Sequence, residues 1–206
     1  MTFDLGYDPA IVAEPRLVTA MLRDVEQTFD LVMIMELMDE SLVLLRRLMC
    51  WATDDVAFLP KNARFESRRA ELSERQRAAL EELLEPDVTL YRHFRRRLAE
   101  RVAAVPLEAF LAQAETLVAR RLFWRRRCVV DTVRGNELDG DQHELSGKVQ
   151  GYELGDRGDW MFSRLGMAEL GYTELVREAQ RQRLSVWRRV KELLGADSEP
   201  TPADQG

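Results

Sequence analysis

The sequence predicts a mostly helical α/β protein with about six helices and one or two strands. A short apolar run over residues 29–35, interrupted only by Asp30, is typical of a strand covered on both faces. Several other segments carry an apolar residue every three to four positions, as one face of a helix does. With 206 residues and 46% hydrophobic content, the chain can build one domain with a real core. We expect that domain to cover residues 1–194.

The elements of the first third follow from these patterns. Residues 16–28 predict a helix, and the predicted strand 29–35 comes next. A second helix is expected over residues 40–52, with Asp39 as its N-cap. The short segment 56–59 then leads through a proline into a polar Lys-Asn-Ala-Arg loop.

Helices fill much of the remaining chain. Ser73 is expected to begin a helix that ends near Leu84, with Gln76 as its capping-box partner. Two further amphipathic helices are predicted over residues 86–105 and 107–124, separated by a proline.

The last part of the chain changes in composition. Residues 134–158 are rich in glycine and polar residues, which predicts a long loop. A final helix or helix pair is expected over residues 160–194. The polar, proline-containing residues 195–206 predict a disordered tail.

Charge and composition exclude some functions. The formal charge of −6 disfavours broad nucleic-acid binding. The N-terminus is acidic and no apolar run approaches the length of a membrane-spanning helix, so these features alone predict a cytoplasmic protein. Cys50 and Cys128 are far apart, which leaves open two buried free thiols or one disulfide. His93 and His143 lack ligand partners at zinc spacing, and we expect no metal site.

Four blocks of sequence carry a family resemblance. They are MDESLVLLRRLMCW (38–51), DDVAF (54–58), KNAR (61–64) and TLYRHFRRRLAERV (89–102), with FDLGYD (3–8) before them and GYELGDRG (151–158) matching more loosely. In this order they resemble the galactose-3-O-sulfotransferase family, which includes galactosylceramide sulfotransferase. The similar part covers most of the chain from residue 3 to about residue 194.

The resemblance implies a fold, an activity and a compartment. It implies the C-terminal half of a P-loop-type sulfotransferase fold. Family members transfer a sulfonate from 3'-phosphoadenosine 5'-phosphosulfate to the 3-hydroxyl of galactose on a glycolipid or glycan, in the Golgi lumen. Their donor-binding loop and membrane anchor precede the region that this chain resembles. Gly147-Lys148 is followed by Val149 and does not form a phosphate-binding loop. We therefore expect an N-terminal half to be supplied in cis or in trans.

Three groups of residues are candidate ligands. Glu36, Asp39 and Glu40 follow the predicted strand, where ligands bind in parallel sheets, and could hold sugar hydroxyls. The alternative for this acidic set is helix capping and solvated charge.

Lys61, Asn62 and Arg64 could bind the donor phosphates or the sugar, or could form an ordinary surface loop. The resemblance places Gly151, Tyr152 and Arg157 in a late loop that covers the nucleotide in relatives. Gly155 and Asp156 stand where relatives carry basic residues. No catalytic base is assigned.

Three functions compete at this level. The first is a galactose 3-O-sulfotransferase whose donor site lies outside this chain. The second is a non-catalytic helical binding or scaffolding protein descended from that fold. The third is an interaction module that uses the arginine-rich residues 120–127 on an anionic partner; the structural alternative makes that run the solvated side of a helix end. Because the apolar strand would have unpaired edges, we predict an isolated chain that is poorly soluble or homo-oligomeric.

Overall fold

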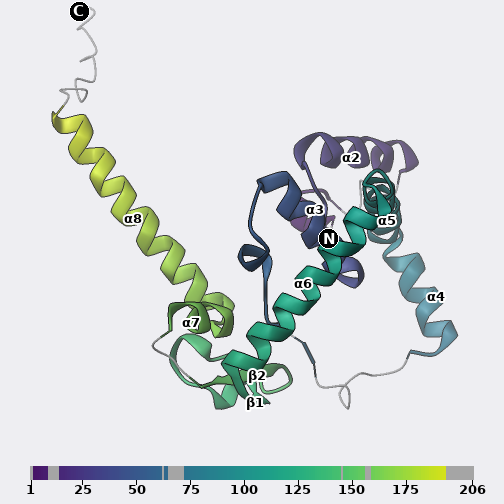
Figure 1. Cartoon of the computed structure of the whole chain (residues 1–206). Helices are drawn as coiled ribbons and strands as arrows, with labels where there is room; N and C mark the ends of the chain where they lie inside the picture. The colour runs from purple at the N-terminus through teal and green to yellow at the C-terminus, as the bar shows by residue number, and fades with distance from the viewer. Residues whose placement is uncertain are drawn as a thin grey trace, which may run out of the picture. The chain divides into compact units, whose positions relative to one another are not determined.

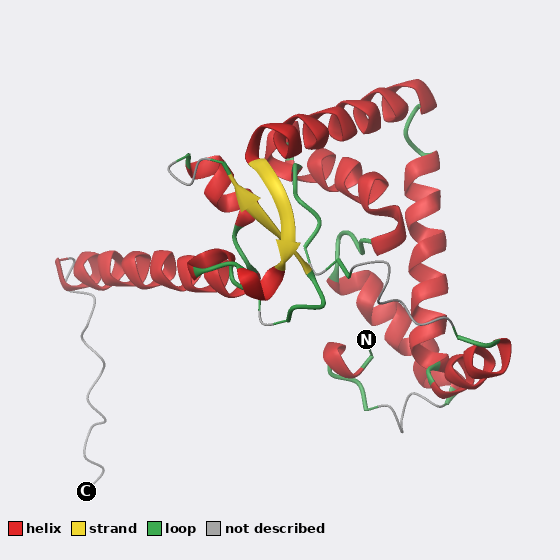
Figure 2. Ribbon diagram, turned by 90° about the horizontal axis from the view of Figure 1, so that it is seen from below, coloured by secondary structure: helices red, strands yellow, loops and turns green. Residues whose placement is uncertain are grey.

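A computed structural model describes residues 2–8, 14–61, 63–64, 72–144, 146–155 and 159–193. Within these residues the chain forms seven α-helices and one two-stranded sheet (Figures 1 and 2). The predicted mostly helical α/β class is therefore confirmed. The chain divides into two compact units, one of residues 1–59 and 66–127 and the other of residues 60–65 and 128–206. The predicted disordered tail lies outside the described residues.

The first unit is built from helices. They are α2 (Pro15–Thr28), α3 (Met38–Met49), α4 (Glu74–Leu83), α5 (Glu85–Ala103) and α6 (Leu107–Cys128), whose last residue already belongs to the second unit. Local sequence explains their starts. A proline occupies the first turns of α2 and α5, where its missing N–H costs nothing. Ser73 and Gln76 form the predicted capping box at the start of α4.

Two apolar clusters stabilise the first unit. In the first, α2 packs against α5 through Met21, Phe94 and Leu98. In the second, α3 packs against α6 through residues such as Val43 and Leu117, which are 1% and 2% exposed. The predicted apolar faces are buried only in part: Met21 of α2 and Leu117 of α6 are buried, whereas Met49 of α3 is 48% exposed.

The strand predicted over residues 29–35 is wrong. Phe29 and Ile34 have strand-like dihedral angles, but none of the described residues pairs with the backbone of residues 31–33. The Ile34 N–H instead donates to Ser41 Oγ at 3.1 Å, inside the same helix–loop unit. A strand needs a neighbour to accept its hydrogen bonds, and a short 3-10 helix begins at Met35 instead.

The expected N-cap of the second helix is also wrong. Helix α3 begins at Met38 with Leu37 as N-cap, so Asp39 lies inside the first turn. There its carboxylate still faces the positive end of the helix dipole. The helix ends at Met49, earlier than expected, because Cys50 adopts a left-handed conformation with φ of 53°.

The second unit holds the sheet. Strands β1 (Val129–Arg134) and β2 (Gln150–Leu154) pair antiparallel, with Thr132 opposite Tyr152 (Figure 2). Helices α7 (Trp160–Gly166) and α8 (Glu169–Leu193) follow and confirm the predicted helix pair.

The long loop predicted over residues 134–158 is wrong, because β2 lies within it. The prediction rested on the glycines of this segment, and some of them serve packing instead. A Cβ atom on Gly151 would lie 2.6 Å from Leu138 Cδ1 and 3.0 Å from Gly135 Cα. Glycine is needed there for close packing of the segments and does not mark a flexible loop.

Candidate functional site

The Lys-Asn-Ala-Arg segment lies against β2. The Gln150 N–H donates to the Ala63 carbonyl oxygen at 2.8 Å, and Arg64 forms an isolated antiparallel bridge with Val149. The Tyr152 hydroxyl donates to the Pro60 carbonyl oxygen at 2.8 Å. The structure therefore brings together Lys61, Arg64, Gly151 and Tyr152, which come from two separate sets of candidates.

Lys61 is held firmly within this arrangement. Its Nζ donates to the Gly166 carbonyl oxygen at 2.6 Å, at the C-terminal end of α7 where cations are favoured. The same atom lies 3.9 Å from Glu144 Oε1 and 5.6 Å from the centre of the Tyr152 ring. Burial lowers the pKa of Lys61, and the nearby Glu144 carboxylate partly opposes that shift. These contacts fasten the segment to the sheet and to α7.

The other members of this group differ in exposure. Tyr152 is fully buried, and Gly151 is buried against Leu138. Arg64 is exposed, so its guanidinium faces solvent. Asn62 and Arg157 lie outside the described residues.

The acidic set belongs to the first unit. Asp39 forms an ion pair with Arg121 of α6, whose guanidinium lies 4.7 Å from the Phe58 ring centre. Glu36 is exposed and lines an apolar groove of about 650 Å³ that follows residues 29–36 along α2 and α5. Glu40 is half-buried. Of the three carboxylates, Asp39 is thus engaged in a contact between helices, while Glu36 faces a concave surface.

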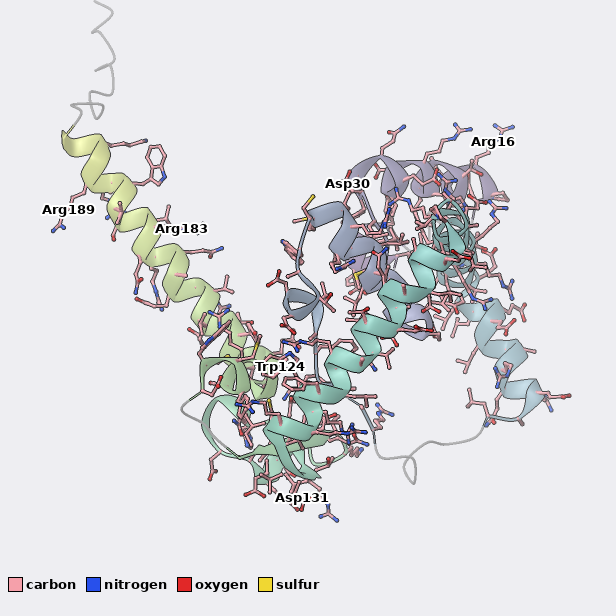
Figure 3. All side chains as sticks on the ribbon, in the orientation of Figure 1. Arg16, Asp30, Trp124, Asp131, Arg183 and Arg189 are labelled. Atoms are coloured by element: carbon pink, nitrogen blue, oxygen red, sulfur yellow. The ribbon has the colours of Figure 1, made fainter. Side chains whose placement is uncertain are left out.

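Carboxylates of the first unit bind the first arginines of the arginine-rich run at the end of α6. Arg120 Nη2 donates to Asp54 Oδ2 at 2.6 Å and its Nε donates to Oδ1, so the pair is bidentate. The indole Nε1 of Trp124, labelled in Figure 3, donates to the same Asp54 at 2.7 Å. The hydrogen bond from Arg120 holds the pKa of Asp54 below its usual range, against the effect of burial, and Trp124 adds to this lowering. The first two arginines of the run therefore stabilise the first unit.

Sequence reasoning missed several of these partners. Asp54, Glu144 and the Gly166 carbonyl are each at least 66 residues from the basic group that they meet. No local pattern signals such pairs. The two cysteines are both free, and Cys50 is exposed rather than buried as one alternative assumed.

The described helices differ from membrane-spanning helices in length and composition. None of them is long and apolar enough to cross a bilayer alone. Helices α5 and α6 reach the length and apolar composition of a membrane span only when they are taken together, and they are bent by 110° at their junction.

Comparison with known proteins places the chain in a family. The model of the galactose-3-O-sulfotransferase family matches residues 1–183, and the chain belongs to this family. It is 39% identical over 156 residues to human galactose-3-O-sulfotransferase 2, covering 75% of this chain and 38% of that protein. It is 40% identical over 130 residues to mouse galactosylceramide sulfotransferase, covering 62% of this chain and 30% of that protein.

A third relative, mouse galactose-3-O-sulfotransferase 3, is 32% identical over 211 residues, or 94% of this chain and 48% of the relative. The chain thus spans less than half the length of these three relatives. No solved structure matches the chain significantly.

Proposed function

We propose that this chain supplies the acceptor-side part of a sulfotransferase that transfers a sulfonate from 3'-phosphoadenosine 5'-phosphosulfate to the 3-hydroxyl of galactose on a glycolipid or glycan. The observation that carries the proposal is the family match over residues 1–183. The relatives are named for galactose or galactosylceramide as acceptor. The donor-binding part is supplied by residues outside this sequence, in cis or in trans.

Residues 31–34 support this division. They lie along the apolar groove, and none of the described residues pairs with the backbone of residues 31–33. We expect a strand from the donor-binding half to pair there and extend a P-loop-type sheet. Glu36 would then follow the carboxyl end of a paired strand, which is where ligands bind in such sheets. Its carboxylate can accept hydrogen bonds from galactose hydroxyls, as can that of Glu40.

The second group of residues adds one contact to the anionic donor, whose main binding site we place outside this sequence. Lys61 acts as a positioning residue, because its Nζ is used on Gly166 and near Glu144. It holds the segment that presents the exposed Arg64. A guanidinium there can bind a phosphate or sulfate through two parallel hydrogen bonds. Tyr152 supports the same segment through its bond to Pro60.

The proposed reaction is a single in-line displacement at sulfur. The galactose 3-oxygen forms a bond to sulfur as the bond between sulfur and the 5'-phosphate oxygen breaks. The hydroxyl proton goes to a base, and the leaving phosphate takes the electron pair. No base is assigned within this chain, so the proposal places it in the donor-binding half.

A complementation assay tests the proposal. The chain would be co-expressed with the region of human galactose-3-O-sulfotransferase 2 that precedes its match, and transfer of radiolabelled sulfonate to galactosylceramide and to a galactoside glycan would be measured. The relative's own C-terminal region, supplied in trans, shows whether complementation works. We expect transfer, and a loss of about tenfold to a hundredfold for Arg64→Ala, the range of a charge-assisted hydrogen bond. Lys148→Ala, at an exposed lysine of the same unit, should leave it unchanged.

Donor binding by the chain alone gives a second readout. We expect calorimetry to detect no binding of the sulfate donor to the isolated chain. A micromolar dissociation constant would contradict the division of the site. If the relative's own C-terminal region restores sulfonate transfer and this chain does not, the result would favour the non-catalytic scaffolding alternative.

A further inference from the structure

Helix α8 is unusually exposed for an amphipathic helix. Met167 and Ala168, just before it, are buried, and its start contacts the short 3-10 helix at Gly140–Gln142. From Glu174 to Arg189 every residue is exposed. Figure 1 shows the helix continuing well beyond α7 and the sheet of its own unit.

An apolar stripe follows this exposed stretch. Tyr172, Leu175, Val176, Val186 and Trp187 recur at helical spacing and are 38%, 38%, 48%, 61% and 64% exposed. The small Ala179 lies at the middle of the stripe. At 1.5 Å per residue the stripe is about 22 Å long. A face of this length is a surface for another helix rather than a set of scattered apolar residues.

Arg183 interrupts the same face between Ala179 and Val186.

Charge divides the helix into two halves of opposite sign. Residues 169–179 carry three glutamates and one arginine, a net charge of −2. Residues 180–193 carry four arginines, one lysine and one glutamate, a net charge of +4. Arg183 and Arg189, both labelled in Figure 3, belong to the basic half.

We propose that α8 is a self-association surface, on which α8 of a second copy of this chain docks in antiparallel orientation. The mixed charge of the helix favours this partner. A two-fold axis near the middle of the stripe sets the acidic half of each helix against the basic half of the other. A parallel pair would set +4 against +4, and an anionic membrane would meet the acidic half unfavourably.

The side chains fit the antiparallel pair. Val176 of each helix faces the region of Val186 in the other. At the two ends of the stripe, Tyr172 of one helix lies near Trp187 of the other. Ala179 allows close approach at the crossing, and the aliphatic part of Arg183 covers it. Glu169 and Lys191 lie on the same flank of the stripe in opposite halves, at nearly equal distances from its middle, and both are exposed. The antiparallel pair therefore brings Glu169 of one copy near Lys191 of the other.

Sedimentation velocity of the 206-residue chain tests the proposal, with reductant present because Cys50 is exposed. We expect a species of twice 23.9 kDa at micromolar concentration. The double variant Val176→Glu with Val186→Glu should raise the dissociation constant by at least about tenfold, since each charge would desolvate in the stripe. Circular dichroism should show retained helicity, because glutamate is a better helix former than valine. Ser185→Glu, off the stripe, should leave the dimer intact.

A charge exchange tests the orientation. Glu169→Lys and Lys191→Glu should each weaken the dimer several-fold, and the two changes combined should restore it. A wild-type chain that stays monomeric, a dimer that survives the double valine variant, or losses that add in the combined charge variant would each overturn the proposal. Flotation of a monomeric chain with phosphatidylcholine vesicles would assign the stripe to a membrane instead.

Discussion

Asp54 is a residue on which two side chains converge. Its carboxylate accepts two hydrogen bonds from Arg120 and one from Trp124, and it remains 33% exposed. Asp54→Asn should lower the free energy of unfolding by about 1 kcal/mol at pH 7, a small value because solvent screens the pair. Chemical unfolding measures this. Glu115→Gln, an exposed carboxylate on the same α6, is the matched control and should change little.

The effect of Asp54 should depend on pH in one direction. Because its pKa is lowered in the folded state from the usual 3.8, its contribution is fully present above that pH. It is lost as the pH falls below 3.8 through the folded-state pKa. The stability difference between wild type and Asp54→Asn should therefore begin to shrink as the pH falls toward 3.8 and should continue to shrink below it. A difference that grows on acidification would contradict the assigned ion pair.

Gly151 is constrained by packing. A Cβ there would lie 2.6 Å from a methyl group of Leu138 and 3.0 Å from the backbone of Gly135. We expect Gly151→Ala to destabilise the second unit by about 1–3 kcal/mol, as overpacking usually does. Gly155→Ala is the control, because its Cβ would meet a Val130 methyl at 3.2 Å and the Cys128 carbonyl oxygen at an ordinary 4.0 Å, and Val130 is 70% exposed and can shift. Equal effects of the two changes would show that packing at Gly151 is not limiting.

At the scale of the element, α4 depends on its cap. The helix has no buried residue, so packing contributes little to it. Ser73→Ala removes the acceptor for the Gln76 N–H, and protection of the α4 amides in hydrogen exchange should fall by about 0.5–2 kcal/mol. Ser73→Asp keeps an acceptor and should preserve most of the protection. Unchanged exchange in Ser73→Ala would mean that another contact holds the helix.

Helices could be predicted from the sequence and strands could not, for a physical reason. The face of α2 is encoded by residues three and four apart, and the cap of α4 by Ser73 and Gln76. Residues 29–35 have the composition of a strand, but pairing depends on a partner that is distant in sequence. In the same way, the glycines around β2 predict a loop, although Gly151 serves close packing with Gly135.

The candidate site was predicted in part. The sequence marked Lys61 and Tyr152 independently, and the structure places them in contact. It did not reveal that Asp39 pairs with Arg121, because that contact spans 82 positions. Ion pairs of this kind depend on how helices pack, which no local window of sequence contains.

At the scale of the whole molecule, residues 29–35 are the expected aggregation surface. Phe29 is 46% and Met35 75% exposed beside an open groove. Met35→Lys should raise the soluble concentration of the isolated chain severalfold, because a charge beside the open apolar groove opposes association through that surface. Leu83→Lys, at a residue 76% exposed on α4, is the control and should have less effect. If both changes act alike, general surface hydrophobicity limits solubility.

The second unit takes its Pro60–Arg64 segment from the first third of the chain, while β2 begins only at Gln150. This has a consequence for biosynthesis. At about 5–20 residues per second, a ribosome needs several seconds after Arg64 to deliver the strand on which that segment lies. During this interval Lys61 has neither Glu144 nor Gly166 as a partner. The Pro60–Arg64 segment therefore stays without its native partners while the chain up to Gly166 is synthesised. We expect a chaperone that binds this segment during synthesis to raise the yield of native protein.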